Sequence, residues 1–446
     1  MATAEAGAAR RSLAPFVAPF FVARSPLAPS PPAPLGEWAE TAVAEQVPSV
    51  LRAPPEVAAW GATAKWTPEY LDEALGQSPL PAKLQSYGSA SAAFFPRGCC
   101  PLGPMTAKAV MDGTSGYGYA SVPGEWFLAK DARLAADIGS LAPFVAPLGA
   151  HVDDIVHQLW LSSRGVVTPL HDDYPANFFV QLYGSKELVL FPPEAYRDLG
   201  LFPRSSFYHR QLAVDLRLDP GRGSPCWPGP LPCTLPHSLF ATNKTAWKER
   251  MAALQGAGLR VVLNEGDVLY LPPLWFHTVR THDASISTNF WVHHPALLEL
   301  DRLWEVKAPS SPSALRAVVA GLAHRFGPDF VLSVRDRWLA GEAMTALHDS
   351  IHPEDPDWKG YLEEDRSTPL AARVMADPLT CPAGDSEYAA AGGDGAPAAL
   401  VAVLDIVAAA ENAGGSAGQI EIVVGHWLEA AVEHVVQGAW ACVLEP

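Results

Sequence analysis

Residues 177–191 read NFFVQLYGSKELVLF, and this stretch decides the fold class. It consists of two apolar runs rich in aromatic and β-branched residues, 177–183 and 186–191, which flank the turn sequence Tyr183-Gly184-Ser185. Runs of this composition are typical of strands, and a short connection containing glycine predicts an antiparallel hairpin. We therefore expect a β hairpin at this point of the chain.

The same strand pattern continues on both sides, from about His157 to His294. Further strands are expected at 157–161, 259–263, 268–271 and 286–293, and the turn sequence at 264–267 predicts a second hairpin. Short strands at this density are typical of a sandwich or barrel. Residues 205–258 are rich in Pro, Gly and Ser in their first half, and we interpret them as a long inserted excursion between strands.

Composition excludes several classes of protein. The 446 residues carry 48 acidic and 31 basic side chains, for a formal net charge of −17. Coating of a nucleic-acid duplex is therefore not expected, since it requires clustered positive charge to displace phosphate counterions, whereas a local basic pocket stays open. No apolar run approaches the roughly 20 residues that span a bilayer, so no membrane segment is expected. Six cysteines form no C-x-x-C pair, which favours a reducing compartment, the cytoplasm or the nucleus.

The two ends of the chain differ from its centre. Residues 1–36 are rich in Ala, Pro and Ser, which is typical either of a disordered tail or of a transit peptide that would direct the protein to an organelle. A short strand is expected at 49–51 and a helix at 67–75. Beyond Pro295 helices are expected at 313–325, 336–347 and 421–443, with a Gly/Ala-rich linker at 381–418. These C-terminal helices would either cover the β core or form a homodimer contact.

Histidine and carboxylate spacing points to a metal site. Two histidines and one carboxylate can bind Fe(II) on one face and leave positions open for other ligands. His171 and Asp173 are two residues apart, so on an extended chain both side chains point to the same side. The chain has three H-x-[DE] matches, whereas its composition alone predicts about 1.5, so spacing decides nothing. The other two begin at His151 and His352.

Sequence context separates these three matches. Only His171 leads directly into a marked strand and turn, whereas His151 and His352 lie in acidic segments that are typical of a surface histidine beside an acid. A candidate third ligand follows 106 residues later in GDVLYLPPLWFHTV, a strand, a Pro-Pro break and a strand bearing His277. Because its neighbours are apolar, that imidazole needs a partner, either a core hydrogen bond or a metal.

Three segments in this order resemble the JmjC and cupin-like Fe(II)/2-oxoglutarate oxygenases. They are TPLHDDY at 168–174, NFFVQLYGSKELVLFPP at 177–193 and GDVLYLPPLWFHTV at 266–279. The resemblance covers about residues 46–294 and is strongest to the asparaginyl hydroxylase that inhibits the hypoxia-inducible factor and to related small hydroxylases. It implies a mainly β core, a double-stranded β-helix or jelly roll, with helical N-terminal and C-terminal elaborations. We accordingly expect an oxygenase domain at 37–300 and a helical region at 301–446.

The resemblance also implies a set of site residues. His171, Asp173 and His277 match the iron ligands, while Lys186 and Thr168 match the residues that hold the distal carboxylate of 2-oxoglutarate. Asn177 and Asn289 match polar positions near the metal and the cosubstrate, although each is equally typical of a strand amide that satisfies the backbone. Phe127 stands where the nearest relatives have a cosubstrate-contacting tyrosine, so Tyr117 or Tyr119 could supply that hydroxyl instead.

The implied activity is an Fe(II)- and 2-oxoglutarate-dependent dioxygenase that hydroxylates a C–H bond with dioxygen. A protein substrate is expected, because the resemblance is to hydroxylases and no histone-reading module accompanies the core. N-methyl-lysine demethylation and tRNA hydroxylation use the same chemistry and stay open as alternatives, the latter disfavoured by the net charge. A non-catalytic cupin-like binding module is the alternative from another class, but a scaffold needs neither the triad nor Lys186.

Overall fold

The structure is a computed structural model that describes residues 25–76, 78–85, 102–113, 116–197, 199, 254, 256–309, 312–335 and 395–435. Its strands are β1 (Ser25–Pro26), β2 (Ser49–Leu51), β3 (Leu80–Gln85), β4 (Leu102–Met105), β5 (Tyr117–Pro123), β6 (Val156–Ser162), β7 (Val167–Asp172), β8 (Ala176–Tyr183), β9 (Lys186–Phe191), β10 (Leu259–Leu263), β11 (Val268–Leu271), β12 (Phe276–Thr281) and β13 (Ser285–Val292).

In the sequence, helices precede and follow the core strands β6–β13. Before the core lie α1 (Leu35–Glu45), α2 (Pro55–Ala58), α3 (Gly61–Lys65), α4 (Pro68–Leu75), α5 (Ala107–Asp112), α6 (Gly124–Leu128), α7 (Ala132–Asp137), α8 (Ala142–Val145) and the 3₁₀ turns η1 (Ala146–Leu148) and η2 (Val152–Asp154). The 3₁₀ turn η3 (Pro193–Arg197) follows β9, and α10 (Pro295–Asp301), η4 (Arg302–Glu305), α11 (Pro312–Phe326), α16 (Gly395–Asn412) and α17 (Ala417–Val435) follow β13.

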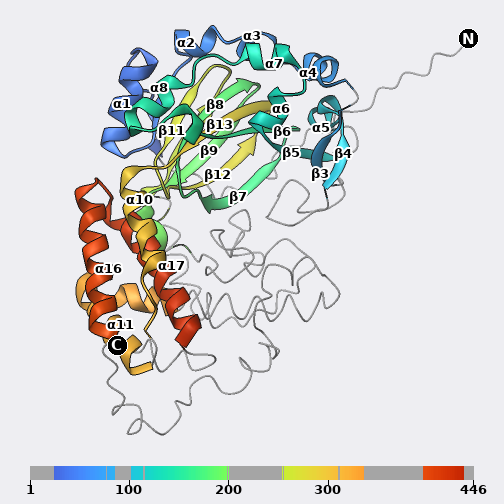
Figure 1. The fold of residues 1–446 in the computed structure, drawn as a ribbon. Helices are drawn as coiled ribbons and strands as arrows, with labels where there is room; N and C mark the ends of the chain where they lie inside the picture. The colour runs from blue at the N-terminus through green and yellow to red at the C-terminus, as the bar shows by residue number, and fades with distance from the viewer. Residues whose placement is uncertain are drawn as a thin grey trace, which may run out of the picture.

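The core is formed by two facing sheets (Figure 1). A five-stranded sheet has the order β1-β10-β9-β12-β7, and an eight-stranded sheet has the order β2-β11-β8-β13-β6-β5-β3-β4. Every pairing among the strands that face the cavity is antiparallel. The mainly β core with helical additions at both ends is thus confirmed, and the predicted strands 186–191, 259–263 and 268–271 have the predicted bounds.

Both predicted hairpins are wrong. β8 pairs with β11 and β13, whereas β9 pairs with β10 and β12 in the other sheet, so the turn at 183–185 carries the chain from one sheet to the other. The turn at 264–267 does the same between β10 and β11. The local sequence specifies the reversal of direction. The pairing partner is selected by the jelly-roll arrangement, which joins successive strands across the two sheets.

The N-terminal helices cover the outer face of the larger sheet (Figure 1). Their apolar residues share one buried cluster with β6, β8, β11 and β13. Asp137, at the end of α7, joins these helices, because its 2% exposed carboxylate accepts hydrogen bonds from Lys65 Nζ, from Trp66 Nε1 at 3.0 Å and from Tyr70 Oη at 2.6 Å. The predicted helix at 67–75 is present as α4, and Thr67 caps it by accepting from the Tyr70 amide.

Part of the expected N-terminal tail pairs with the core. Residues 25–36 were expected to belong to a disordered tail or transit peptide, but β1 pairs with β10, and Leu27 N donates to Arg260 O at 2.8 Å. Backbone pairing with a sheet edge compensates for the lack of an apolar pattern in this stretch. The remainder of the expected tail, 1–24, lies outside the described residues.

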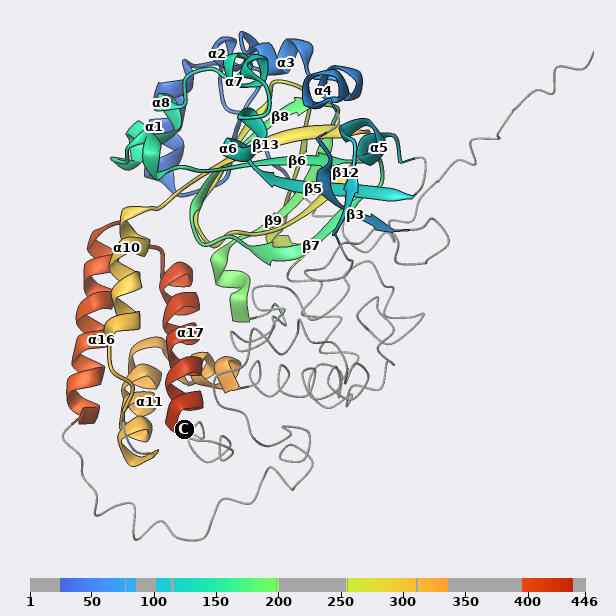
Figure 2. The ribbon, with the colours of Figure 1, turned by 45° about the vertical axis from the view of Figure 1, so that its right-hand side comes forward.

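The C-terminal helices form a bundle below the core, next to the end of β9 (Figure 2). Leu170, Phe191 and Phe276 of the smaller sheet lie in the same buried cluster as α10, α11, α16 and α17. A linker at 381–418 was expected, but 395–412 is the helix α16. The alanine-rich composition was misread there, because alanine is the best helix former and α16 is apolar enough to be packed on several sides. A homodimer contact through this bundle stays a prediction.

Several predictions fall wholly or mainly outside the described residues. These are the excursion at 205–258, the helix at 336–347, the part of the last helix beyond Val435 and all six cysteines. The division into domains stays a prediction. In the part of the chain that the structure describes, no helix is both long and apolar enough to cross a bilayer.

Candidate metal and cosubstrate site

Antiparallel pairing of β7 with β12 brings the predicted metal ligands together. His171 and His277 are direct cross-strand partners, and their ring centroids are 4.2 Å apart. Asp173 follows the last residue of β7 and returns to the same side as His171. One possible ligand atom from each of the three residues lies within 4.8 Å of those of the other two. This cluster could hold a metal ion.

Backbone hydrogen bonds orient both imidazoles. His171 Nδ1 lies 2.8 Å from Pro169 O, and His277 Nδ1 lies 3.1 Å from Trp275 O. A carbonyl oxygen only accepts, so each Nδ1 carries a hydrogen, and Nε2 is the nitrogen whose lone pair a neutral imidazole can offer to a metal. Metal-binding histidines usually donate the hydrogen of their other ring nitrogen to a carbonyl or carboxylate in this way, which fixes the orientation of the ring. Two imidazole nitrogens and one carboxylate therefore fit the donor set of a facial triad.

Hydrogen bonds to the side chain and to the backbone help to hold Asp173. Trp291 Nε1 donates to Asp173 Oδ2 at 3.2 Å, and Leu274 N donates to the Asp173 carbonyl at 2.8 Å. Leu274 has φ +61°, a left-handed conformation that costs a non-glycine residue roughly 1–2 kcal/mol. The sequence did not single out Trp291, although strand alternation from Asn289 would have placed it on the same face.

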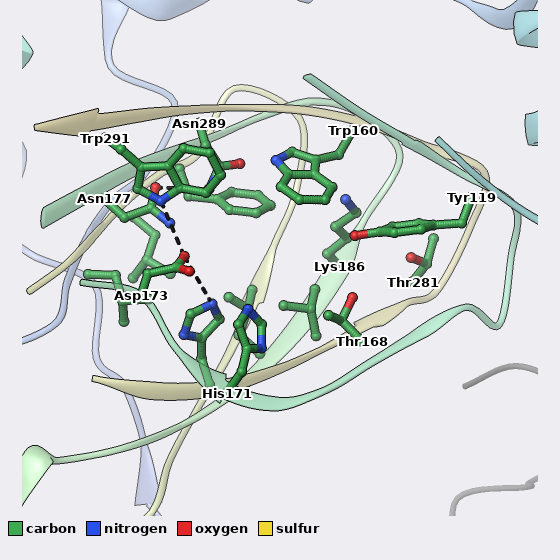
Figure 3. Close-up of a pocket in the computed structure, with 16 residues that line it drawn as sticks. Tyr119, Trp160, Thr168, His171, Asp173, Asn177, Lys186, Thr281, Asn289 and Trp291 are labelled. Carbon is green, nitrogen blue, oxygen red and sulfur yellow. Dashed lines mark hydrogen bonds and ion pairs between the residues drawn. The ribbon is translucent and has the colours of Figure 1, made fainter. Parts of the chain in front are cut away.

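The cavity between the two sheets has a volume of about 250 Å³ (Figure 3). Alternate residues of β8, β9, β11, β12 and β13 line it, as the pleat of a strand predicts. On β7 the lining residues Thr168 and His171 are three apart, because the pairing with β12 shifts register between them. All seven predicted site residues, His171, Asp173, His277, Thr168, Lys186, Asn177 and Asn289, line it together with Tyr119, Trp160, Phe179, Leu188, Leu269, Leu271, Val279, Thr281 and Trp291.

Lys186 is the buried cation of this cavity. It is 3% exposed, extends from β9 across the interior and donates to Ser287 Oγ of the opposite sheet at 2.7 Å. Its ammonium lies 5.5 Å from the Phe179 ring centroid. Among the described residues no carboxylate forms an ion pair with it, and burial lowers the pKa of Lys186 to about 7. An unpaired buried ammonium at the end of a cavity is suited to an incoming anion.

The two asparagines lie at the metal end of the cavity and bond to each other. Asn289 Nδ2 donates to Asn177 Oδ1 at 2.8 Å, and both side chains are at most 3% exposed. Asn289 Oδ1 and Trp160 Nε1 are buried without a hydrogen-bond partner among the described residues. Such unsatisfied groups are costly in an empty cavity and are available to a polar ligand.

Tyr119, and not Phe127 or Tyr117, reaches the cavity. Its ring stacks on Trp160 at a centroid distance of 5.7 Å, and Figure 3 places its hydroxyl on the side of Lys186 and Thr168. Phe127 is fully buried in the N-terminal core, 5.6 Å from the Trp66 ring, so its alignment with the cosubstrate-contacting tyrosine was wrong. Phe127 lies on α6, and its side chain packs among the N-terminal helices and not in the cavity.

Of the two other H-x-[DE] matches, the one that the structure describes, at His151, does not line the cavity. His151 is on the surface, with a side chain 77% exposed and its partner Asp153 89% exposed. His352 lies outside the described residues.

Comparison with known proteins agrees with this geometry. The chain is 25% identical over 234 residues to lysine-specific demethylase 8 of Xenopus tropicalis, which covers 52% of this chain and 45% of that protein. It is 25% identical over 244 residues to the human bifunctional peptidase and (3S)-lysyl hydroxylase JMJD7, covering 52% and 73%. It is 34% identical over 164 residues to the tRNA wybutosine-synthesizing protein 4 of Neurospora crassa, covering 36% and 11%.

The chain therefore spans less than half of the first and third of these relatives. The resemblance to the JmjC and cupin-like family is confirmed, while the particular resemblance to the asparaginyl hydroxylase stays a prediction. A family model described as "Cupin-like domain" matches residues 34–296, more than half of the chain. The protein belongs to the cupin-like domain family.

Proposed function

We propose that this protein is an Fe(II)- and 2-oxoglutarate-dependent dioxygenase that hydroxylates a C–H bond of a protein side chain. The observation that carries the proposal is the presence, in one cavity, of a His-Asp-His cluster at one end and an unpaired buried ammonium, Lys186, at the other. A 2-oxo dicarboxylate has a chelating group and a distal carboxylate, and thus matches both ends.

Lys186, Thr168 and Tyr119 would hold the distal carboxylate. An ammonium in a site with few other charges forms a strong, charge-assisted hydrogen bond to a carboxylate, and two hydroxyl groups can satisfy its other lone pairs. All three side chains line the same part of the cavity (Figure 3). Ser287 fixes the ammonium by accepting one of its hydrogens.

His171, Asp173 and His277 would hold the metal, with their orientation fixed before binding by the hydrogen bonds to Pro169 O and Trp275 O. Fe(II) with 2-oxoglutarate supplies the oxidising chemistry of dioxygen, which no side chain can supply. Leu188, Leu269 and Leu271 would give the bound groups an apolar wall, which limits the water around them.

A protein substrate is supported by charge and by the relatives. The formal net charge of −17 repels nucleic acid and attracts basic polypeptide segments. Two relatives are named as a lysine-specific demethylase and a lysyl hydroxylase, so both act on amino-acid side chains. Hydroxylation and N-demethylation give different products, one gaining an oxygen atom and the other losing a methyl group.

The test is iron-dependent formation of succinate from 2-oxoglutarate by the purified chain. His277→Ala should abolish both this turnover and Mn²⁺ binding, whereas His151→Ala, in the exposed H-x-D match, should leave both unchanged. Wild-type protein that binds neither Mn²⁺ nor 2-oxoglutarate would refute the proposal, and so would turnover that survives in His277→Ala.

The substrate is then sought by mass spectrometry of proteins from cells with and without active enzyme. Sites that gain one oxygen only with the active enzyme would support hydroxylation. Sites that lose a methyl group only with the active enzyme would show that the activity is demethylation and not hydroxylation.

A further inference from the structure

A tight turn at residues 272–275 comes just before His277 in the chain and is hydrogen-bonded to Asp173. Trp275 N donates to Pro272 O at 3.3 Å, with Pro273 in the second position and Leu274, at φ +61°, in the third. Proline followed by a residue of positive φ is the pattern of a type II turn, which normally needs glycine or asparagine in that third position. His277 follows the last residue of this turn, Trp275, by two residues.

The central peptide of the turn is held from both sides. Its N–H group, on Leu274, donates to the Asp173 carbonyl at 2.8 Å. Its carbonyl group, on Pro273, accepts from Gln419 Nε2 at 3.0 Å. Type I and type II turns differ by a rotation of about 180° of this peptide, and the type I form would let Leu274 adopt the ordinary right-handed conformation. That rotation would break both hydrogen bonds, so together they oppose it.

Gln419 is itself fixed by its place at the start of α17. It is the third residue of the helix after the cap Ser416, whose N–H donates to Gln419 Oε1 at 2.9 Å, while Gln419 N donates to Ser416 Oγ at 3.3 Å. This reciprocal pair is a capping box, and it directs the oxygen of the amide toward the cap. The NH₂ group therefore faces Pro273 O and, at 3.4 Å, Gln46 Oε1.

Close packing keeps this helix end in place. The Gln419 side chain is 1% exposed, and a Cβ atom added at the neighbouring Gly418 would lie 2.6 Å from Glu194 N of η3. The start of α17 thus lies directly against the segment that follows β9, and Gln419 has no room to swing away from the turn.

From this geometry we infer that Gln419, in the C-terminal helical region, is a positioning residue for the metal site. By holding the Pro273–Leu274 peptide it maintains the hydrogen bond to Asp173 and the path of the chain into His277. The inference rests on the proposed function, since it assumes that these two residues bind the metal. It gives the C-terminal helices a part in the chemistry of a site to which they contribute no ligand.

The experiment measures Co²⁺ binding to the full chain by the visible absorption of the bound ion. Gln419→Asn keeps an amide that is one methylene too short to reach Pro273 O, and Gln419→Met fills a similar volume without a donor. Ser416→Ala is the matched control, because it weakens the same helix cap and leaves the bond to Pro273 intact. Hydrogen exchange of the Leu274 amide is followed in all the proteins.

Both Gln419 variants should raise the Co²⁺ dissociation constant about tenfold, the low end of the range for outer-shell groups. They should also exchange the Leu274 amide hydrogen at least tenfold faster, a change of about 1.4 kcal/mol in the opening equilibrium. Ser416→Ala should change neither quantity more than twofold.

Wild-type affinity in the Gln419 variants, or equal losses in Ser416→Ala, would overturn the inference alone. Absence of Co²⁺ binding by the wild-type chain would overturn the proposed function as well.

Discussion

Binding of 2-oxoglutarate should be coupled to uptake of a proton by Lys186. Burial lowers the pKa of this side chain to about 7 in the ligand-free protein, so about half of the molecules carry a neutral amine at pH 7. A carboxylate beside the nitrogen favours the charged form and restores the pKa toward its ordinary value. Binding must then draw a proton from solution whenever Lys186 is neutral.

The magnitude follows from that pKa. Uptake should be about 0.5 proton per ligand at pH 7 and about 0.9 at pH 8, and the dissociation constant should rise roughly fivefold between these two values. Above pH 8 the rise should approach tenfold per pH unit. The direction is fixed by the sign of the charge, because deprotonation removes the attraction for the anion.

Titration calorimetry on Mn²⁺-loaded protein, in buffers of different ionisation enthalpy, measures this uptake directly. Pyruvate is the control ligand, since it has the same chelating end as 2-oxoglutarate but no distal carboxylate, and it should take up no proton through Lys186. Lys186→Met should lose the uptake and the affinity for 2-oxoglutarate while retaining its affinity for pyruvate. Equal uptake with the two ligands, or none at pH 8, would refute the reasoning.

Three further outcomes are expected. Tyr119→Phe should raise the apparent KM for 2-oxoglutarate about tenfold, as loss of one hydrogen bond to a charged group predicts, whereas Tyr117→Phe, on the same strand but outside the cavity lining, should not change it in the same turnover assay. Trp291→Phe removes the donor to Asp173 and should weaken Mn²⁺ binding roughly tenfold in equilibrium titrations, while Mn²⁺ affinity equal to wild type would exclude a supporting role for the indole. Asp137→Ala leaves three donors without their acceptor and should lower the free energy of unfolding by about 3 kcal/mol in urea titrations, with no change in metal affinity.

The local sequence was sufficient for the strands and for the ligand candidates. Alternation and turn residues located β9, β10 and β11 to the residue, and all seven predicted site residues line one cavity. Spacing alone could not choose among the three H-x-[DE] matches, whereas the strand that follows His171 could. These features depend on neighbours within a few residues along the chain.

Contacts between distant segments were decided by tertiary structure. Whether β8 pairs with β9 or with β13 depends on which apolar faces are buried together, and short-range pattern gives both options the same local geometry. Tyr119 faces the cavity, whereas Phe127 is drawn into the helical layer, because β5 joins the sheet and α6 lies above it. An alignment over a few residues does not show which of the two aromatic side chains faces the cavity.

By itself, the sequence determined which residue types are present and which strands present them: an H-x-D followed by a strand, a distant histidine after a Pro-Pro break, and a lysine beyond a glycine turn. Only the tertiary structure decided that β7 and β12 pair so that the histidines face each other, that Lys186 meets no carboxylate among the described residues, and that Gln419 reaches the turn before His277. The physical reason is that hydrogen bonding and burial are set by proximity in space, and proximity between segments hundreds of residues apart exists only once the core has packed.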